Sequence, residues 1–253
     1  MHLDRLITVL ETVAVAGRAI SASELQHTTG LPRPTCYRLL QTLAEQRLLD
    51  EPAGDGRYVI GERLIGIALL GQSDVDIGRA AAPALKDASL ELGEAVFLSR
   101  FRAKGVEIIQ VETPLDPKRS YIHPGLGFRP MHACSCSKAI AAFAADEFRE
   151  QILASTMRAY TEHTKTEAEL LRAEFADIRA KGFATCVEEI ELGVASVAAP
   201  VRIGNVGVIY SVGATGPIRR FTPKKRAEIG TQLQTLASKV SSAIQLYGTS
   251  AQS

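Results

Sequence analysis

Apolar residues recur every three or four positions through the N-terminal part of the chain, the spacing of helices that bury one face. The segment 21–43, SASELQHTTGLPRPTCYRLLQTL, predicts two short helices joined by a tight turn. Ser21 and Glu24 can cap the first helix reciprocally. Gly30 and Pro32 end it, because glycine permits positive φ and proline cannot extend a helix. The buried face of the second helix comprises Cys36, Leu39, Leu40 and Leu43.

With that face buried, polar side chains near the start of the second helix remain exposed. In a helix-turn-helix these positions contact base edges and phosphates in the major groove, although similar helix pairs also occur in domains that bind no nucleic acid. Residues 48–60 then predict a β-hairpin with Asp55-Gly56 in its turn, and this order of elements is typical of a winged helix. The candidate DNA-contacting residues are Arg33, Thr35, Tyr37, Arg38, Gln41 and Arg57.

The charge of this segment limits how it can attract DNA. Residues 1–63 contain seven arginines, no lysine and eight acidic residues, a net charge of −1, so the broad basic surface of many nucleic-acid binders is absent. Binding must depend on where the cations lie and on more than one DNA-binding head per complex. We expect Arg38 and Gln41 to contact base edges. The expected phosphate contacts are Arg33, Thr35 and Arg57.

The rest of the chain predicts one sheet covered by helices. A connecting helix at 61–73 ends in the turn-forming sequence Gly71-Gln72-Ser73-Asp74. Strands at both ends of the following region, with helices between them, predict a single antiparallel sheet and an α+β fold. The expected strands are 95–101, 106–113, 119–122, 183–188, 196–203 and 206–213, the expected helices are 77–92, 135–145, 146–155, 167–181 and 223–246, and 123–132 is expected to be irregular. We therefore expect a winged helix-turn-helix at 1–60, a connecting helix and linker at 61–77, and a second domain at 78–253.

The amino-acid composition says more about the cellular compartment of the protein than about its function. The chain of 253 residues is 46% hydrophobic and carries a formal net charge of +1, which is ordinary for a globular protein. No apolar run reaches the roughly 20 residues that cross a bilayer, so no membrane partner is expected. The acidic N-terminal segment does not resemble a signal peptide. Four cysteines in this length do not make a disulfide framework, which favours a reducing, cytoplasmic compartment.

Several separated motifs together resemble one family. In chain order they are SASELQHTTGLPRPTCYRLLQTL, GRYVIGERLIGIA, RPMHACSCSKAIAAF, YTEHTKTEAELLRAEFADIRAKGFA, GVASVAAPV and YSVGATGPIRRF. Over nearly its full length the chain is similar to transcriptional regulators of the isocitrate-lyase-regulator (IclR) family. The resemblance implies a ligand-responsive DNA-binding protein and not an enzyme. It also implies that residues 78–253 form a GAF-like effector-binding domain, and that two dimers join into a tetramer.

The expected effector site is the start of the helix at 135–145. Backbone N–H groups there have no helical partner and lie at the positive end of the helix dipole, which suits a carboxylate. The resemblance places the pocket between this helix and the sheet. There Ser211 and Gly213 share one face, Gly213 keeps that wall open, and Phe128 or Met131 forms an apolar wall. A small organic acid, aromatic acids included, fits such a site. The candidate effector-binding residues are Met131, Cys134, Ser135, Cys136, Ser137, Cys186, Ser196, Ser211 and Gly213.

The sequence HACSCSKA at 132–139 departs from the family's usual HATALGKA, so the effector cannot be copied from a relative. Its cysteines leave two alternatives open. Cys134 or Cys136 beside His132 could be the nucleophile of a small-molecule enzyme, and a thiol at a helix start could be a redox sensor. A zinc site is not expected, because one residue between ligands is too few and no second pair follows. We expect no metal and no other cofactor, and we expect His132 to form a hydrogen bond within its own loop.

The expected partners follow from these assignments. They are double-stranded promoter DNA, a small carboxylate and a second copy of the chain. The apolar helix around Leu64 to Leu69 is expected to help pair two chains, and the symmetry of such a dimer requires a palindromic operator.

Overall fold

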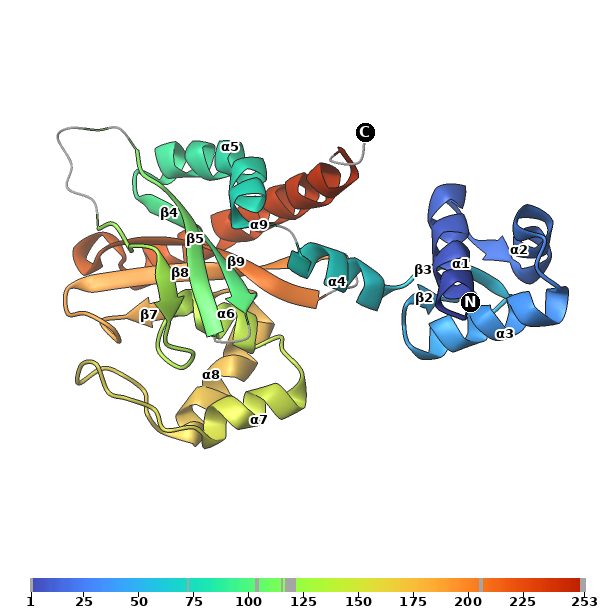
Figure 1. Cartoon of the computed structure of the whole chain (residues 1–253). Helices are drawn as coiled ribbons and strands as arrows, with labels where there is room; N and C mark the ends of the chain where they lie inside the picture. Colours follow the sequence, from blue (N-terminus) through green and yellow to red (C-terminus); the bar gives the residue numbers. More distant parts are fainter. Residues whose placement is uncertain are drawn as a thin grey trace. The chain divides into compact units, whose positions relative to one another are not determined.

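A computed structural model of the chain describes residues 2–71, 73–102, 105–114, 116, 122–204 and 207–250. It contains two compact units, one ending at residue 72 and one extending from residue 73 to the C-terminus apart from residues 204–206 (Figure 1). Each unit has its own sheet and its own hydrophobic core. The expected functional boundaries at residues 60 and 77 stay a prediction.

The first unit is a winged helix, as the sequence predicts. Its helices are α1 (His2–Ala16), α2 (Ala22–Thr29), α3 (Arg33–Glu45) and α4 (Glu62–Gly71). The strands β1 (Ile20–Ser21), β2 (Leu49–Asp50) and β3 (Arg57–Ile60) form an antiparallel sheet in the order β1-β3-β2.

Local signals fix the helix-turn-helix. The N–H of Ser21 donates to the Glu24 carboxylate at 2.8 Å and the Ser21 hydroxyl accepts from the Glu24 N–H, so the predicted capping box is confirmed. Gly30 ends α2 in the left-handed region at φ 70°. The apolar faces then close on one core, in which each fully buried leucine contributes about 1.5–3 kcal/mol. Its buried members are Val9, Val13, Ile20, Leu25, Cys36, Leu39, Leu40, Leu43, Leu49 and Tyr58.

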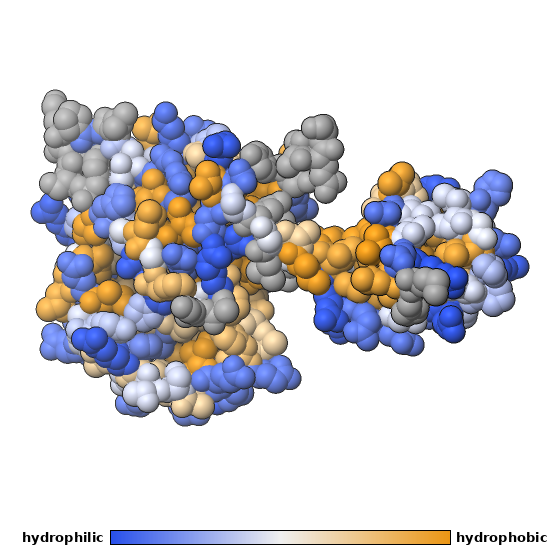
Figure 2. All heavy atoms as spheres, viewed as in Figure 1, coloured by the Kyte–Doolittle hydropathy of each residue, from blue (hydrophilic) through white to orange (hydrophobic). Residues whose placement is uncertain are grey.

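The start of α4 is held against the end of the recognition helix α3. A Cβ on Gly61 would lie 2.5 Å from the carbonyl oxygen of Arg47, so only glycine fits this backbone approach. The N–H of Arg63 donates to the same carbonyl at 3.1 Å, and the Arg63 guanidinium donates to the carbonyl of Gln46 at 3.2 Å. Hydrophobic residues nevertheless gather on the surface of α4 (Figure 2), where Ile65 is 40% and Ile67 is 55% exposed.

The second unit is built on one antiparallel sheet of six strands in the order β6-β5-β4-β9-β8-β7. The strands are β4 (Ala95–Arg102), β5 (Gly105–Glu112), β6 (Gly127–Arg129), β7 (Ala184–Val187), β8 (Val194–Ile203) and β9 (Gly207–Pro217). Helices α5 (Asp74–Leu92) and α9 (Pro223–Ser250) cover one face, and α6 (Ser135–Ala141), α7 (Asp146–Ala154) and α8 (Ala168–Lys181) lie on the other (Figure 1). A short 3₁₀ turn, Ile218–Arg220, joins β9 to α9. The predicted α+β class is confirmed, and no described helix is both long and apolar enough to span a membrane.

The sheet differs from the prediction at one edge. Residues 119–121 of the expected third strand lie outside the described residues, and Ile122 is not in a strand. The edge strand is β6, inside the stretch expected to be irregular. It pairs Arg129 with Val106 and Gly127 with Ile108. The strand β6 has only three residues, one of them a glycine, and so short a segment shows no alternating hydrophobic pattern. Only its pairing with the distant strand β5 reveals it.

A buried arginine attaches the first helix of the second unit to the sheet. Alternate residues of β4 face opposite sides, so Arg100 lies on the α5 side, where its side chain is 1% exposed. Its Nη1 lies 2.8 Å from the Asp74 carboxylate, and Arg102 pairs with the other oxygen of that carboxylate. Asp74 is the first residue of α5, which starts here rather than at the predicted Ile77 because Ser73 caps it. The second unit is therefore anchored from its first residues.

Replacing Gly61 tests the connection of α4 to α3. Gly61→Ala should lower the free energy of unfolding of the winged helix by about 1–3 kcal/mol, because the methyl group must displace backbone atoms. Gly71→Ala is the matched control, because a Cβ there meets nothing within 4 Å. Chemical denaturation of the full chain measures both, and equal effects of the two substitutions would contradict the tight approach.

Candidate DNA-binding surface and effector site

The exposed side of α3 carries the predicted DNA contacts. The helix begins directly after Pro32, and Pro34 lies in its first turn, where a missing N–H costs no helical hydrogen bond. The polar row therefore starts at the N-terminal end of the helix, the end that reads bases in helix-turn-helix proteins. Its members are Arg33, Tyr37, Arg38 and Gln41, all exposed, and Thr35, which is half-buried.

A hollow of about 520 Å³ lies beside this row. It is lined by the start of α2, the first turn of α3 and the tip of the wing, including Ser23, Arg33, Tyr37 and Gly56. A helix start and an arginine on one concave surface suit a DNA phosphate. Ser23 is absent from the predicted set, and its place two residues after the cap Ser21 is the only sequence signal for it.

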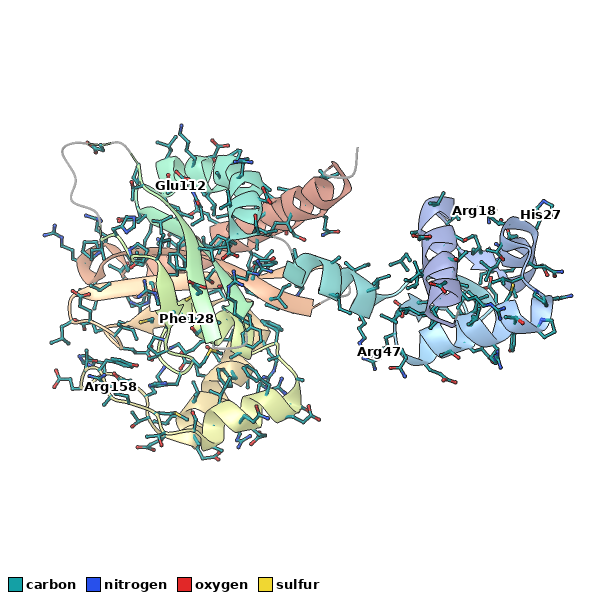
Figure 3. The ribbon with its side chains drawn as sticks, viewed as in Figure 1. Arg18, His27, Arg47, Glu112, Phe128 and Arg158 are labelled. Atoms are coloured by element: carbon teal, nitrogen blue, oxygen red, sulfur yellow. The ribbon has the colours of Figure 1, made fainter. Side chains whose placement is uncertain are left out.

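Arg57 has a partner within the protein. Its Nη1 donates to the carbonyl of Ala19 at 2.9 Å and lies 3.3 Å from the Glu24 carboxylate, so it braces β3 against the start of α2. The hydrogen bond from the Ser21 N–H, together with Arg18, lowers the pKa of Glu24 to about 2, so this carboxylate stays charged near neutral pH. Arg18 (Figure 3) pairs with Glu24 at 2.7 Å and is 61% exposed. Phosphate contact by Arg57 stays a prediction, and Arg18 is a second cation near the same carboxylate that the sequence analysis missed.

In the second unit, the start of α6 meets the sheet through buried hydroxyl groups. The Ser135 and Ser196 hydroxyls lie 2.7 Å apart, and the Ser211 and Ser99 hydroxyls lie 2.6 Å apart. The Ser211 hydroxyl also donates to the carbonyl of Cys136 at 3.2 Å. Four predicted residues, Ser135, Cys136, Ser196 and Ser211, are thus brought together with one, Ser99, that was missed. Ser99 lies opposite Ser211 in the pairing of β4 with β9. This pairing could not be derived from the sequence, so the sequence held no signal for Ser99.

The other predicted residues surround this cluster at different depths. Cys186 is buried on β7, directly opposite Ser196 of β8. The Ser137 hydroxyl donates to the carbonyl of Arg129, and Met131 is half-buried against the core. Phe128 (Figure 3) lies on the edge strand β6 and is 50% exposed, so the core side of the site takes its apolar contact from elsewhere.

Gly213 does not hold a pocket wall open, so that part of the prediction is wrong. It shares the α6 side of β9 with Ser211, but a Cβ at Gly213 would lie 2.3 Å from Cζ of Phe97. Phe97 is paired with Gly213 across β4 and β9 and is 2% exposed. The glycine therefore makes room for an aromatic ring of the core.

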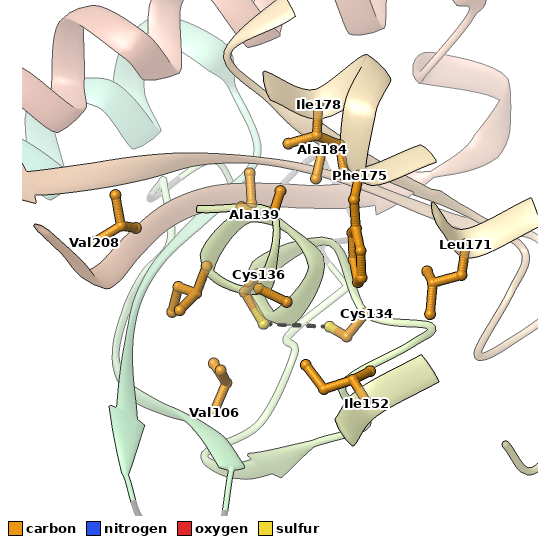
Figure 4. Packing of buried hydrophobic residues seen from close by; sticks show 14 of the residues in the cluster. Val106, Cys134, Cys136, Ala139, Ile152, Leu171, Phe175, Ile178, Ala184 and Val208 are labelled. Carbon is orange, nitrogen blue, oxygen red and sulfur yellow. Dashed lines mark hydrogen bonds between the residues drawn. The ribbon is translucent and has the colours of Figure 1, made fainter. Parts of the chain in front are cut away.

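The two cysteines at the start of α6 contact each other. Their Sγ atoms are 3.3 Å apart inside the hydrophobic core (Figure 4). The hydrogen bond with Cys136 and burial both raise the pKa of Cys134 well above its ordinary value. Burial acts to raise the pKa of Cys136 as well, but hydrogen bonds from Cys134 and Ser137 lower it overall. Burial raises the pKa of Cys186 to about 12, so Cys186 remains a protonated thiol.

A buried ionic network that the sequence analysis missed fixes α6. Lys138 is fully buried, with Nζ 2.8 Å from Glu174 on α8 and 2.7 Å from Glu189 after β7, and Lys165 also pairs with Glu174. Two cations and two carboxylates balance in charge, which limits the cost of burying them. The sequence signal for this network was Lys138 itself, a charged residue among the small and apolar residues of α6.

The expectation for His132 is only partly correct. Its Nε2 lies 2.9 Å from the carbonyl of Arg158 and its ring stacks on Tyr160, so it bonds to a different loop from its own. Among the described residues, no three histidine, cysteine or acidic side chains converge as metal ligands would.

Comparison with known proteins identifies the family. A model of the IclR helix-turn-helix domain matches residues 2–52, and a model of the bacterial transcriptional regulator IclR C-terminal domain matches residues 71–242. The chain belongs to the IclR family. It is 30% identical to the glycerol operon regulatory protein of Streptomyces griseus over 94% of both chains.

Solved IclR-family structures share the fold. The IclR transcriptional regulator of Alicyclobacillus acidocaldarius matches with a TM-score of 0.61 at 22% identity, covering 95% of this chain and 96% of that one. An IclR homolog of Microbacterium hydrocarbonoxydans complexed with 4-hydroxybenzoate matches with a TM-score of 0.59 at 24% identity, covering 97% and 100%. The protein is thus a ligand-responsive transcriptional regulator with a helix-turn-helix domain and a C-terminal effector-binding domain, in a family of regulators and not of enzymes.

Proposed function

We propose that this IclR-family regulator acts in the cytoplasm as a dimer on a palindromic operator, and that a small organic acid bound between α6 and the sheet changes its affinity for DNA. Two such dimers form a tetramer. The observation that carries the proposal is the group of buried hydroxyls between α6 and the sheet, in a chain whose other unit exposes a polar recognition helix.

The buried hydroxyls support a carboxylate ligand. The hydroxyls of Ser135 and Ser196 share a hydrogen bond with each other at the first turn of α6. An incoming carboxylate would accept both hydroxyl donors and the N–H groups of the helix start, exchanging a neutral hydrogen bond for charge-assisted ones. The homolog complexed with 4-hydroxybenzoate supports including aromatic acids among the candidates. Phe97 is in the core cluster on this side of the sheet and Met131 packs against it, and we assign these two side chains to contact such a ring.

The surface of α4 supports pairing of two chains. Ile65 and Ile67 are exposed, and Leu64 is half-buried, while the side chain of Leu69 lies outside the described residues. On α1 of the same unit, Leu3 and Ile7 are 66% and 44% exposed at adjacent turns. A second copy would cover these residues and would supply the second DNA-binding head that a weakly charged unit requires.

The DNA proposal predicts different effects for base and phosphate contacts. Arg38→Ala should weaken binding to a fragment of the protein's own promoter about 5- to 100-fold, and binding to random duplex much less. Arg33→Ala should weaken both alike and reduce the salt dependence by about one phosphate contact. Fluorescence anisotropy at fixed ionic strength measures these constants. Arg5→Ala, at an exposed arginine of α1, is the control for loss of charge alone.

The dimer proposal predicts that charge on α4 separates the chains. Ile65→Glu combined with Ile67→Glu should remove the α4 interface, so that sedimentation equilibrium shows a smaller assembly than the wild type, and should abolish operator binding at concentrations where the wild type is bound. Val75→Glu is the control, because Val75 is 67% exposed on α5 of the second unit. An assembly of unchanged size in the doubly substituted protein would exclude this surface as an interface.

The effector proposal predicts which acids bind and which side chains hold them. Calorimetry of the full chain with benzoate, 4-hydroxybenzoate and pyruvate, against benzamide as a neutral control, should show saturable binding of an acid. Ser135→Ala should weaken that binding about tenfold or more, because a charge-assisted hydrogen bond is lost. Ser155→Ala, at an exposed serine of the same unit, should leave it unchanged.

The thiol-sensing alternative rests on the 3.3 Å approach of Cys134 and Cys136. The doubly substituted protein, Cys134→Ser with Cys136→Ser, should keep its response to an acid. If that protein loses regulation while the wild type responds to peroxide and to no acid in the panel, the redox alternative replaces the acid sensor.

A further inference from the structure

A second concave site lies at the other end of α6 from the hydroxyl cluster. It is a groove of about 530 Å³ between the C-terminal end of α8, the strand β8 and the helix α9. This volume falls in the range of small-ligand sites, about 300–1,000 Å³. The residues of its lining used below are Phe143, Arg179, Lys181, Arg202, Gln234 and Ser238.

Two arginines converge on neighbouring residues in this groove. Nη1 of Arg179 donates to the carbonyl of Ala142 at 3.1 Å, and the guanidinium carbon of Arg202 lies 4.4 Å from the ring centroid of Phe143. Arg179 comes from α8 and Arg202 from β8, so the fold and not the local sequence brings the two charges together. Stacking on the aromatic ring holds the guanidinium of Arg202 in place before any ligand arrives.

The charges of the groove are not balanced from within. Its lining contains three cations, Arg179, Lys181 and Arg202, and no carboxylate. Lys181 pairs with Asp177 on α8 at 2.8 Å, whereas within the described part of the chain neither arginine has a carboxylate within ion-pair distance. Two like charges that face one hollow repel each other, and a bound anion would relieve that repulsion. On the α9 side, the Gln234 amide already donates to the carbonyl of Lys181 at 2.7 Å and the Ser238 hydroxyl to the carbonyl of Gln234 at 3.3 Å, so the cations are the groups left to hold a ligand.

We propose that this groove is a second ligand site of the regulator and binds a small anion of two or more charges, a phosphate ester or a di- or tricarboxylate. Planar guanidinium groups bind phosphate and carboxylate through paired N–H donors, which a lysine cannot do. Among the described residues, the guanidinium of Arg202 donates no hydrogen bond and that of Arg179 donates to the carbonyl of Ala142, so both have donors for a ligand. The site does not depend on the acid proposed for the start of α6, because the two share no residue.

Titration of the full chain with three probes tests this site. Inorganic phosphate, citrate and sulfate are added separately at constant ionic strength, with chloride as the monovalent control, and the heat of binding is recorded. At least one multivalent probe should bind saturably at one per chain, and chloride should not. Stronger binding of phosphate assigns the site to phosphate esters, and stronger binding of citrate assigns it to polycarboxylates.

Variants locate the bound anion. Arg202→Ala should weaken binding about tenfold or more, and Arg202→Lys should recover only part of it, because the charge returns without the paired donors. Ser238→Glu, at an exposed position of α9, should also prevent binding by placing a carboxylate in the groove. Lys224→Ala removes an exposed cation of α9 outside the lining and should change affinity less than twofold.

Each contrary result is decisive. If none of the three probes binds saturably, the groove is not an anion site. If Arg202→Ala and Lys224→Ala weaken binding equally, the probes respond to overall charge and the proposal is also wrong. Arg202 is exposed, so its loss should not unfold the chain, and an unchanged denaturation midpoint verifies this.

Discussion

The second unit depends on what strand β4 carries on its two sides. On one side, the buried guanidinium of Arg100 holds Asp74, the residue with which α5 begins. On the other side, the next residue back, Ser99, shares a hydrogen bond with Ser211 at the candidate effector site. Side chains alternate along a strand, so the adjacent residues Ser99 and Arg100 point to opposite sides of β4. A single peptide bond therefore separates the contact with the start of α5 from the contact at the start of α6. A charge on this strand also has to stay paired, since leaving a buried guanidinium without its carboxylate costs several kcal/mol, about 3–5 in comparable cases.

The winged helix was predictable because its signals are local. The Ser21–Glu24 cap, the glycine that ends α2 and the apolar spacing of α3 each lie within one turn of the backbone they determine. The sheet of the second unit was predictable in kind but not in detail. The edge strand β6 and the pairing of Ser99 with Ser211 are contacts between distant segments, which no window of sequence contains. The same holds for Lys138, whose two carboxylate partners come from α8 and from the turn after β7.

The candidate sites show that the type of a residue does not by itself determine what its side chain contacts. A glycine on a strand facing a helix suggested open space, yet at Gly213 the space belongs to the ring of Phe97. An arginine beside a wing suggested a phosphate contact, which stays a prediction, and the structure adds that Arg57 also bonds to Glu24 and to a backbone carbonyl. At both positions, the contacting residues are distant in the sequence, so the local sequence does not show these contacts. Ser135 and Ser137 are both buried at the start of α6, and effector binding by these serines stays a prediction.

The close approach at Gly61 has a mechanical consequence. Because the start of α4 lies against the carbonyls of Gln46 and Arg47, which directly follow α3, backbone contacts join these two helices within the first unit. A displacement of α4 would therefore reach the recognition helix through the backbone, without depending on a flexible side chain.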